Sequence, residues 1–317
     1  MSFSDTIKQE ILNKPIKENH CKLAFLSGII RGNGVLYKRD GELGIDFRVP
    51  SENCVFAVTM LLKSLFNYDV REVMVTDNPF SKKDKFIISI YGKGAVNIFK
   101  ALGILSESED EIQVSLDMFN DLVKEECCLR AFFRGLFISA GTCTLPNEGT
   151  RRNNTGYHLE LSFSHSAPAQ ATANKLAKCG IYPKITRRKE NFIVYLKSAE
   201  EIKDFIAFLP APLSVLKMTE LIINKEISNN SNRQKNCDLG NVNRQIEASI
   251  KQIDAINKID KHFGLSWLKE DLYNVAIARK ESPDETLQEL ATKLNVSKSC
   301  LNHRLRKIVC IANEIKD

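Results

Sequence analysis

Apolar and small residues recur with the same spacing in two segments of the chain. One segment reads LAFLSGIIRGNG from Leu23 to Gly34, and the other reads FFRGLFISAG over 132–141. An offset of 135 − 28 = 107 residues places Gly28 on Gly135, and a second small residue follows four positions later in each segment. Positions i and i+4 share one face of a helix. The pattern therefore predicts two helices whose backbones approach each other closely.

Alternating apolar and polar residues follow each predicted helix. Residues 42–49 and 158–164 alternate with period two, which predicts half-buried strands. Further patterns predict helices at 54–66, 96–102, 169–179 and 200–209, and strands at 71–76, 86–90, 184–188 and 192–196. Each half reads helix, strand, strand, helix, strand, strand, helix. This order predicts an internal duplication, with repeats at about 20–105 and 127–210.

The pattern changes after the second repeat. A helix over 213–227 leads into SNNSNRQKNCDLGN at 228–241, a polar segment that we interpret as a linker. Its Asn and Asp residues either cap the flanking helices or form a hinge that fixes one domain relative to the other. Only helical patterns follow. We therefore expect domains at 1–227 and 242–317.

Two short helices near the C-terminus share a recognisable boundary pattern. Thr286-x-x-Glu289 is a capping-box sequence, and Ser297 is the expected N-cap of the next helix after a turn at 295–296. The second helix has Leu301, Leu305 and Ile308 on one face. Helix, short turn and helix is the arrangement that places a second helix in the major groove of DNA.

The other face of that second helix is polar and basic. Residues 297–309 contain four Lys or Arg residues and no acid. Asn and Arg side chains suit base edges, and the flanking cations suit phosphates. The alternative is a solvated outer face. We predict DNA contacts from the following residues: Ser297, Lys298, Ser299, Asn302, His303, Arg304, Arg306 and Lys307.

Composition is ordinary for a globular protein, with 317 residues, 43% apolar, 26% charged and a net charge of +6. No apolar run approaches the roughly 18 residues that a membrane span needs. The first helix, which mixes Asp5, Lys8 and Glu10 with apolar residues, is amphipathic and unlike a signal peptide. We therefore expect a cytoplasmic protein that associates with the nucleoid and keeps its nine cysteines reduced.

His20-Cys21 and Cys127-Cys128 occupy matching positions before the two repeated helices. Four potential zinc ligands would meet if the helices pack together. The separated CxxC pairs of common structural zinc sites are missing, however, and cysteine packs well as a small apolar residue. The sequence therefore favours burial at the repeat interface, and we predict no metal and no cofactor.

The segments LSGIIRGNG (26–34) and FRGLFISAG (133–141) resemble degenerate copies of the LAGLIDADG motif of homing endonucleases. The whole chain is similar to the WhiA family of bacterial sporulation and cell-division regulators. The similarity lies in the opening MSF, the cysteines before each repeated helix, NR at 232–233, NCD at 236–238, VSKS at 296–299 and NHRLRK at 302–307.

In LAGLIDADG nucleases, the residue before each final glycine is the acid that holds the catalytic metal ions. This chain has Asn33 and Ala140 at those positions, and neither supplies the carboxylate that two-metal phosphodiester cleavage needs. The resemblance therefore implies a protein without nuclease activity. The alternative is a metal-dependent endonuclease whose acids come from other positions, such as Glu42 or Asp46.

The predicted sheets carry Glu42, Asp46 and Glu160 on their polar faces. Acids repel phosphates, so we do not expect the sheets to read DNA as the nucleases do. An acidic sheet face is also suited to a basic protein partner, which makes a protein-interaction platform a further alternative. Basic residues at the hairpin turns are either phosphate contacts or solvated side chains: Lys82, Lys83, Lys85, Arg187, Arg188 and Lys189.

We therefore predict an α+β fold with two pseudo-symmetric LAGLIDADG-like repeats, followed by an all-α helix-turn-helix domain. The resemblance implies sequence-specific binding of double-stranded DNA in the control of bacterial cell division, chromosome segregation or sporulation, without catalysis. Other transcription-regulator proteins are expected partners, and membranes are not.

Overall fold

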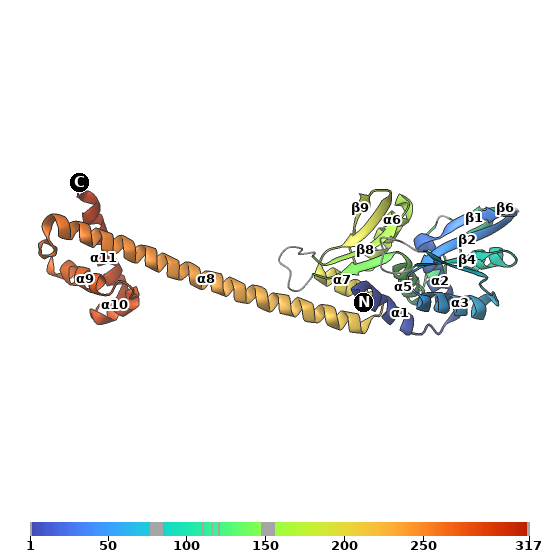
Figure 1. The fold of residues 1–317 in the computed structure, drawn as a ribbon, viewed down its shortest axis with the longest axis horizontal. Helices are drawn as coiled ribbons and strands as arrows, with labels where there is room; N and C mark the ends of the chain where they lie inside the picture. The colour runs from blue at the N-terminus through green and yellow to red at the C-terminus, as the bar shows by residue number, and fades with distance from the viewer. Residues whose placement is uncertain are drawn as a thin grey trace. The chain divides into compact units, whose positions relative to one another are not determined.

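The computed structural model describes residues 2–76, 85–108, 111–115, 117–119, 121–146 and 156–315. The chain divides into two compact units, Met1–Ile223 and Asn224–Asp317 (Figure 1). Each unit has its own hydrophobic core.

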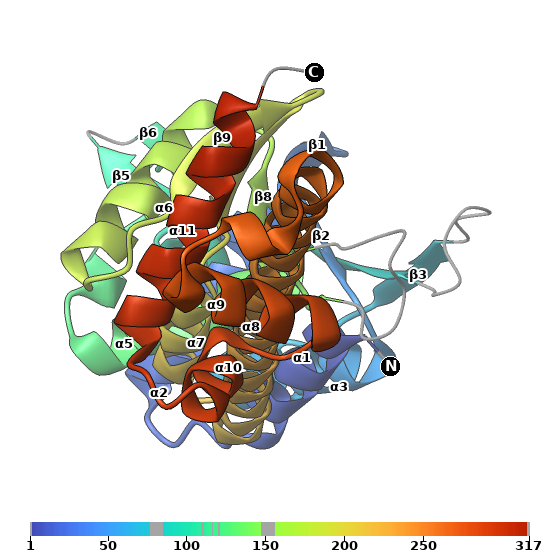
Figure 2. The same cartoon turned by 90° about the vertical axis from the view of Figure 1, so that its left-hand side faces the viewer.

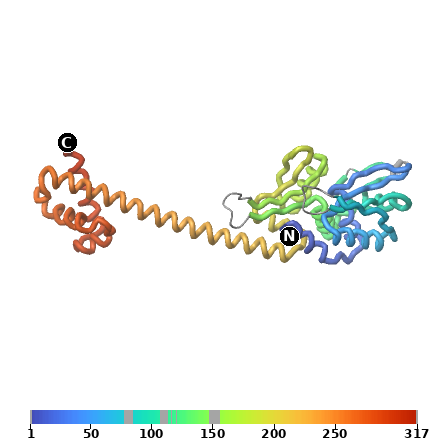
Figure 3. The backbone as a smooth tube through the Cα atoms, viewed as in Figure 1, coloured from blue at the N-terminus to red at the C-terminus, as the bar shows by residue number. Residues whose placement is uncertain are grey.

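The first unit contains both predicted repeats after a helix α1 (Phe3–Asn13). The first repeat consists of α2 (Asn19–Asn33), β1 (Val35–Arg39), β2 (Glu42–Val49), α3 (Glu52–Phe66), β3 (Glu72–Thr76), β4 (Lys85–Tyr91) and α4 (Ala95–Ala101). The second consists of α5 (Glu126–Ala140), β7 (Gly141–Thr144), β8 (His158–Phe163), α6 (Ser166–Lys178), β9 (Lys184–Arg188), β10 (Asn191–Leu196) and α7 (Ala199–Phe208). The predicted order is confirmed in both (Figure 3).

Three elements lie between the repeats: β5 (Leu105–Ser108), β6 (Glu111–Val114) and the short 3₁₀ helix η1 (Asp121–Val123). The sequence analysis did not predict the hairpin that β5 and β6 form. Its strands have four residues each, which is too short for a period-two pattern to stand out.

The two four-stranded sheets have the same topology. Their strand orders are β1-β2-β4-β3 and β7-β8-β10-β9, with antiparallel neighbours. The predicted alternation is confirmed in the central strands, because Ile45, Phe47 and Val49 of β2 and Leu159, Leu161 and Phe163 of β8 are buried. In β2, Phe47 lies opposite Ile88 of β4. Each sheet thus turns one apolar face towards the helices.

Helices α2 and α5 pack against each other at the centre of the first unit, and each contacts both β2 and β8. Figure 1 shows α2 and α5 between β8 and β2, and Figure 2 gives the view turned by 90°. A methyl group at Gly28 would lie 2.1 Å from the carbonyl oxygen of Phe132. One at Gly135 would lie 2.0 Å from the carbonyl oxygen of Phe25. The predicted close approach of the two backbones is confirmed, and glycine is what permits it.

The next small residues along the pair also meet. A Cβ atom at Gly32 would lie 2.0 Å from Ser139 Oγ, so the glycine and the serine four residues after Gly28 and Gly135 face each other. The two helices therefore stay close over at least one full turn, and both repeats share one core.

The second unit is all helical within the residues described. The long helix α8 (Pro212–Phe263) begins in the first unit, and it is followed by η2 (Leu265–Trp267), α9 (Glu270–Glu281), α10 (Leu287–Lys293) and α11 (Lys298–Glu314). The core of this unit collects apolar residues from the end of α8 and from the later helices, including Ile256, Ile259, Val275, Leu290 and Leu305.

The polar segment 228–241 differs from the irregular linker that we expected. It is helical and forms part of α8, so its Asn and Asp residues do not cap two separate helices. The segment contains no proline, and pairs four residues apart support the helix, such as Gln234 Nε2 donating to Asp238 Oδ1 at 3.0 Å. Polarity by itself does not end a helix that lacks proline, and α8 accommodates the one glycine of the segment, Gly240.

We predict that Gly28→Ala lowers the free energy of unfolding of the first unit by about 2 kcal/mol or more, because the added methyl group meets backbone that cannot turn away. Urea unfolding followed by circular dichroism measures the change. Gly156→Ala is the control, since no atom lies within 4 Å of a Cβ built there. Equal unfolding midpoints for the two variants would contradict the close packing of α2 on α5.

Candidate nucleic-acid interface

The helix pair α10 and α11 has well-defined boundaries. Thr286 Oγ1 accepts a hydrogen bond from the Glu289 N–H at 3.3 Å, and Glu289 Oε2 accepts one from the Thr286 N–H at 2.7 Å. This confirms the predicted capping box. The backbone hydrogen bond from Thr286 lowers the pKa of the Glu289 carboxyl. Ser297 caps α11, with Oγ accepting from the Cys300 N–H at 3.2 Å, as predicted.

The turn between the two helices depends on one unusual backbone conformation. Asn295 has a φ of 52°, in the left-handed region that Asn tolerates better than most residues. The Val296 N–H donates to the Ala291 carbonyl at 3.0 Å and closes the turn. The direction in which α11 leaves α10 is therefore set by residues of the turn itself.

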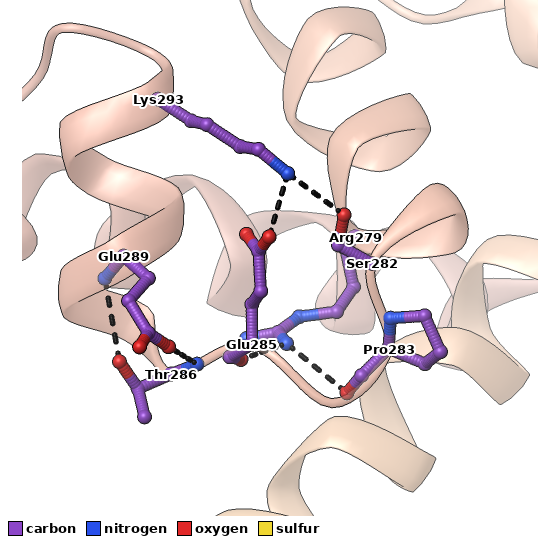
Figure 4. A network of polar contacts seen from close by, with 7 residues as sticks. All are labelled: Arg279, Ser282, Pro283, Glu285, Thr286, Glu289 and Lys293. Carbon is purple, nitrogen blue, oxygen red and sulfur yellow. Dashed lines mark hydrogen bonds and ion pairs between the residues drawn. The ribbon is translucent and has the colours of Figure 1, made fainter.

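A network of polar contacts fixes the loop before α10 (Figure 4). Arg279 of α9 is only 2% exposed, and its Nη1 donates to the Glu285 carbonyl at 2.7 Å and to the Pro283 carbonyl at 3.4 Å. Burial lowers the pKa of this guanidinium group. Lys293 Nζ contacts Glu285 Oε1 at 2.6 Å and Ser282 Oγ at 3.1 Å. These bonds tie α10 to the end of α9.

Helix α11 has one buried and one exposed face. The predicted core stripe is confirmed, because Leu301, Leu305 and Ile308 are buried. Most of the predicted DNA contacts are exposed, namely Ser297, Lys298, Ser299, His303, Arg306 and Lys307, whereas Asn302 and Arg304 are half-buried. Ser299, His303 and Arg306 lie four and three residues apart, so they share the outer face.

Arg304 differs from the other basic residues of α11. Its Nε lies 3.7 Å from Asp271 Oδ2 on α9, and its side chain is 27% exposed. The guanidinium group is therefore directed towards α9 and has a counter-ion within the unit. Of the four predicted cations, Lys298, Arg306 and Lys307 remain on the exposed side of the helix.

Asn33 and Ala140 stand where the resemblance places the acids of the nucleases, and Asn33 has a structural role. Asn33 ends α2, and its Nδ2 donates to the Arg48 carbonyl at 3.0 Å and to the Ser139 carbonyl at 3.1 Å. Its Oδ1 accepts from the Arg48 N–H at 2.7 Å. Asn33 thus joins the first repeated helix to β2 and to α5. Ala140, its counterpart on α5, has no polar atom in its side chain.

Helix α1 lies beside the same place. Ser4 Oγ donates to the Cys143 carbonyl at 2.8 Å and accepts from the Cys143 N–H at 2.6 Å, which binds α1 to β7. A pocket there is lined by Asp5 and Lys8 of α1 and by Asn33, Ser139 and Ala140, among other residues. The first helix therefore brings one acidic and one basic side chain to this pocket.

The two displaced acids do not form a pair. Glu42 begins β2 and is exposed, while Asp46 is half-buried in the middle of the strand. Four residues of strand separate their Cα atoms by about 13 Å. Carboxylates this far apart cannot ligate the same cation together, and the alternative that Glu42 or Asp46 singly serves an endonuclease stays a prediction.

The sheet faces and turns differ in part from the expectation. Glu160 accepts from His158 Nε2 at 2.9 Å and from Arg188 Nη1 at 3.3 Å, so its charge is balanced and its repulsion of phosphates is smaller than expected. Lys85, Arg187, Arg188 and Lys189 are exposed. Lys82 and Lys83 lie outside the described residues.

The four residues His20, Cys21, Cys127 and Cys128 converge. Their potential ligand atoms all lie within 4.8 Å of one another. The expected burial holds for Cys21 and Cys128, whereas His20 and Cys127 are exposed. The sequence signal for this convergence was the shared offset of 107 residues, 128 − 21, between the two pairs. The spacing within each segment does not match a common zinc motif, because the two pairs come together only when α2 packs on α5.

A duplicated helix-and-sheet unit joined to a helix-turn-helix unit defines a LAGLIDADG-like protein with an added all-helical domain. Three family descriptions match the chain: the WhiA N-terminal LAGLIDADG-like domain over 19–105, the WhiA LAGLIDADG-like domain over 129–228 and the WhiA C-terminal HTH domain over 231–312. The chain therefore belongs to the WhiA family.

Relatives and a solved structure agree along the full length. The probable cell division protein WhiA of Clostridium novyi is 33% identical over 321 aligned positions, covering 100% of this chain and 99% of the relative. The Alkaliphilus oremlandii relative is 31% identical, with 100% and 98% covered. The crystal structure of full-length WhiA from Thermatoga maritima has the same fold, with a TM-score of 0.58 at 24% identity and complete coverage of both chains. No helix among the described residues is long and apolar enough to cross a membrane.

We predict that Asn33→Asp lowers the free energy of unfolding by about 2 kcal/mol, because a carboxylate would face the carbonyl oxygens to which the amide now donates. Thermal and urea unfolding measure the loss. Asn53→Asp is the matched control, since Asn53 is exposed in the first turn of α3 and an acid is favourable there. An Asn33→Asp variant as stable as Asn53→Asp would show that the three hydrogen bonds of Asn33 contribute little.

Proposed function

We propose that this protein is a sequence-specific DNA-binding regulator of transcription in bacterial cell division, chromosome segregation or sporulation. One observation carries the proposal: α11 presents an exposed face free of acids, from Ser297 to Lys307, at the second position of a helix-turn-helix. The cell-division name of its relatives supports the biological setting. Such a protein would act in the cytoplasm, on the nucleoid.

Each part of α11 suits a different part of the DNA. The N-terminus of the helix, with Ser297 and Lys298, favours a phosphate because the backbone N–H groups and the lysine carry positive charge. Arg306 and Asn302 suit base edges, since guanidinium and amide groups form paired hydrogen bonds with guanine and adenine. His303 lies on the same outer face as Arg306, and Lys307 borders it and suits a further phosphate contact.

Buried and capping contacts hold α11 in place within the second unit. The buried Arg279 and the capping box on Thr286 hold α10, and α9 and α10 both pack on α11. A base-reading side chain has to be held within a fraction of an ångström of its partner. The exposed residues of the basic turns, Lys85, Arg187 and Lys189, are proposed as additional phosphate contacts, with Arg188 partly engaged by Glu160.

We further propose that the protein is not an enzyme. Asn33 uses its amide to join α2, α5 and β2, and Ala140 offers no ligand. Cation-assisted cleavage needs carboxylates at this place. The runner-up is an endonuclease with displaced acids. Protein partners among other transcription regulators remain a prediction.

Arg306→Ala is expected to weaken binding to a footprinted genomic site by about 1–3 kcal/mol and to relax the preference at one base position. Fluorescence anisotropy on duplexes with each base at each position measures both effects. Arg304→Ala is the matched control. It removes the same charge two residues from Arg306, but the Arg304 side chain already pairs with Asp271. We expect it to cost less and to leave base preference unchanged.

Lys298→Ala is expected to weaken binding to all duplexes equally. It should also reduce the slope of log affinity against log salt concentration by the amount that about one phosphate contact contributes. Titrations at several salt concentrations measure the slope. A uniform loss for Arg306→Ala as well would contradict its role in reading bases. Wild-type affinity for both variants would contradict the assignment of α11 as the DNA-reading helix.

In a plasmid-nicking assay with Mg²⁺, we expect no cleavage by the wild-type protein, for lack of carboxylate ligands at 33 and 140. Metal-dependent cleavage that a chelator abolishes, and that co-purifies with the protein through two chromatography steps, would establish the endonuclease instead. Glu42→Gln and Asp46→Asn would then show whether those acids supply it.

A further inference from the structure

The first turns of α2 and α5 meet at their N-terminal ends. The N-cap residues are Glu18 and Glu125, so His20 and Cys127 occupy the second position of their helices and Cys21 and Cys128 the third. The two pairs are related by the same offset of 107 residues that relates the glycines, 127 − 20. The duplication therefore places two potential ligands from each repeat around one point.

The distances among these four side chains suit a single metal ion. His20 Nδ1 lies 3.0 Å from Cys128 Sγ and 3.4 Å from Cys21 Sγ, and all four ligand atoms lie within 4.8 Å of one another. A tetrahedral zinc ion with Zn–S bonds of about 2.3 Å separates its ligand atoms by about 3.8 Å. Movements of less than about an ångström would thus bring all four to bonding distance.

The chemistry of the set narrows the choice of ion. Three thiols and one imidazole form the Cys₃His set of structural zinc sites, and soft sulfur ligands disfavour Mg²⁺ and Ca²⁺. Among the described residues, no other group of three or more His, Cys, Asp or Glu side chains converges in this way. Four protein ligands leave no open position for substrate, which is the mark of a structural site.

The surroundings of the four side chains suit thiolate ligands. Metal binding requires thiolates and displaces their protons. The converging N-termini of two helices favour negative charge. The exposed His20 and Cys127 leave a path for the ion from solvent.

We infer that His20, Cys21, Cys127 and Cys128 form a structural zinc site that fastens the two repeats together at the N-terminal ends of α2 and α5. The ion would cross-link segments more than a hundred residues apart in the chain. The ion would join the same two helices as the glycine contacts do, but at their N-terminal ends. This inference is independent of DNA binding and holds whether or not α11 reads bases.

The test starts from full-length protein purified and kept under a reductant that does not bind zinc strongly. We expect about one zinc ion per chain by elemental analysis and a mass increase of one zinc in native mass spectrometry. Removal with a chelator should lower the midpoint of thermal unfolding, and added Zn²⁺ should restore it. Titration with Co²⁺ should produce the intense visible bands of a tetrahedral thiolate complex.

Variants localise the ion. Cys128→Ser and Cys127→Ser should each weaken zinc binding about tenfold or more, and chelator should no longer shift their unfolding midpoints. His20→Ala should bind more weakly while keeping a water in the fourth position. Cys179→Ser is the matched control for Cys127→Ser, because Cys179 is also exposed and close to α5 but lies outside the group.

Several results would overturn the inference. One is reduced wild-type protein that carries no zinc and gives no tetrahedral Co²⁺ spectrum, a measurement that stands even if a variant fails to fold. Another is stoichiometric iron in place of zinc. A third is full zinc content in Cys128→Ser, which would place the ion elsewhere. An intact mass lower than that of the fully reduced chain by two hydrogen atoms, measured under reductant, would reveal a disulfide in place of the metal.

Discussion

The contact between the backbones of α2 and α5 governs the first unit. Gly28 meets the carbonyl of Phe132, and Gly135 meets that of Phe25, so neither position accepts a side chain. Because the helices approach this closely, each packs against both sheets, and Phe132, Phe133, Leu26 and Ile29 fill one core instead of two. A single repeat would expose this apolar face, so the duplicated fold depends on the glycine contact.

Polar chemistry occupies both ends of this helix pair. At the C-terminal ends, Asn33 donates to the Ser139 and Arg48 carbonyls. A hydrogen bond between the repeats therefore occupies this end of the pair. At the N-terminal ends, His20 and Cys21 meet Cys127 and Cys128. Asn33 thus links the repeats at one end of the pair, and a bound ion would link them at the other.

The second unit separates support from recognition. Buried groups hold the helices in place: Arg279 bonds the carbonyls of Pro283 and Glu285, and the apolar stripe of α11 packs on α9 and α10. Lys298, His303, Arg306 and Lys307 face outwards, whereas Ser297 caps the helix and Arg304 pairs with Asp271. A helix held by one face and free on the other can exchange its outer residues without loss of stability.

The sequence by itself determined the repeated order of elements, the faces of β2, β8 and α11, the caps at Thr286 and Ser297 and the lost acids at Asn33 and Ala140. Each follows from residue periodicity, local hydrogen bonding or side-chain chemistry, which act over a few residues. The helix over 228–241 has local causes, but a polar segment poor in apolar residues leaves its state open in the sequence. Only the tertiary structure decided that Arg304 turns to Asp271 and that four ligands meet. Those two outcomes depend on which surfaces pack together, and residues 107 apart become neighbours only when α2 lies on α5.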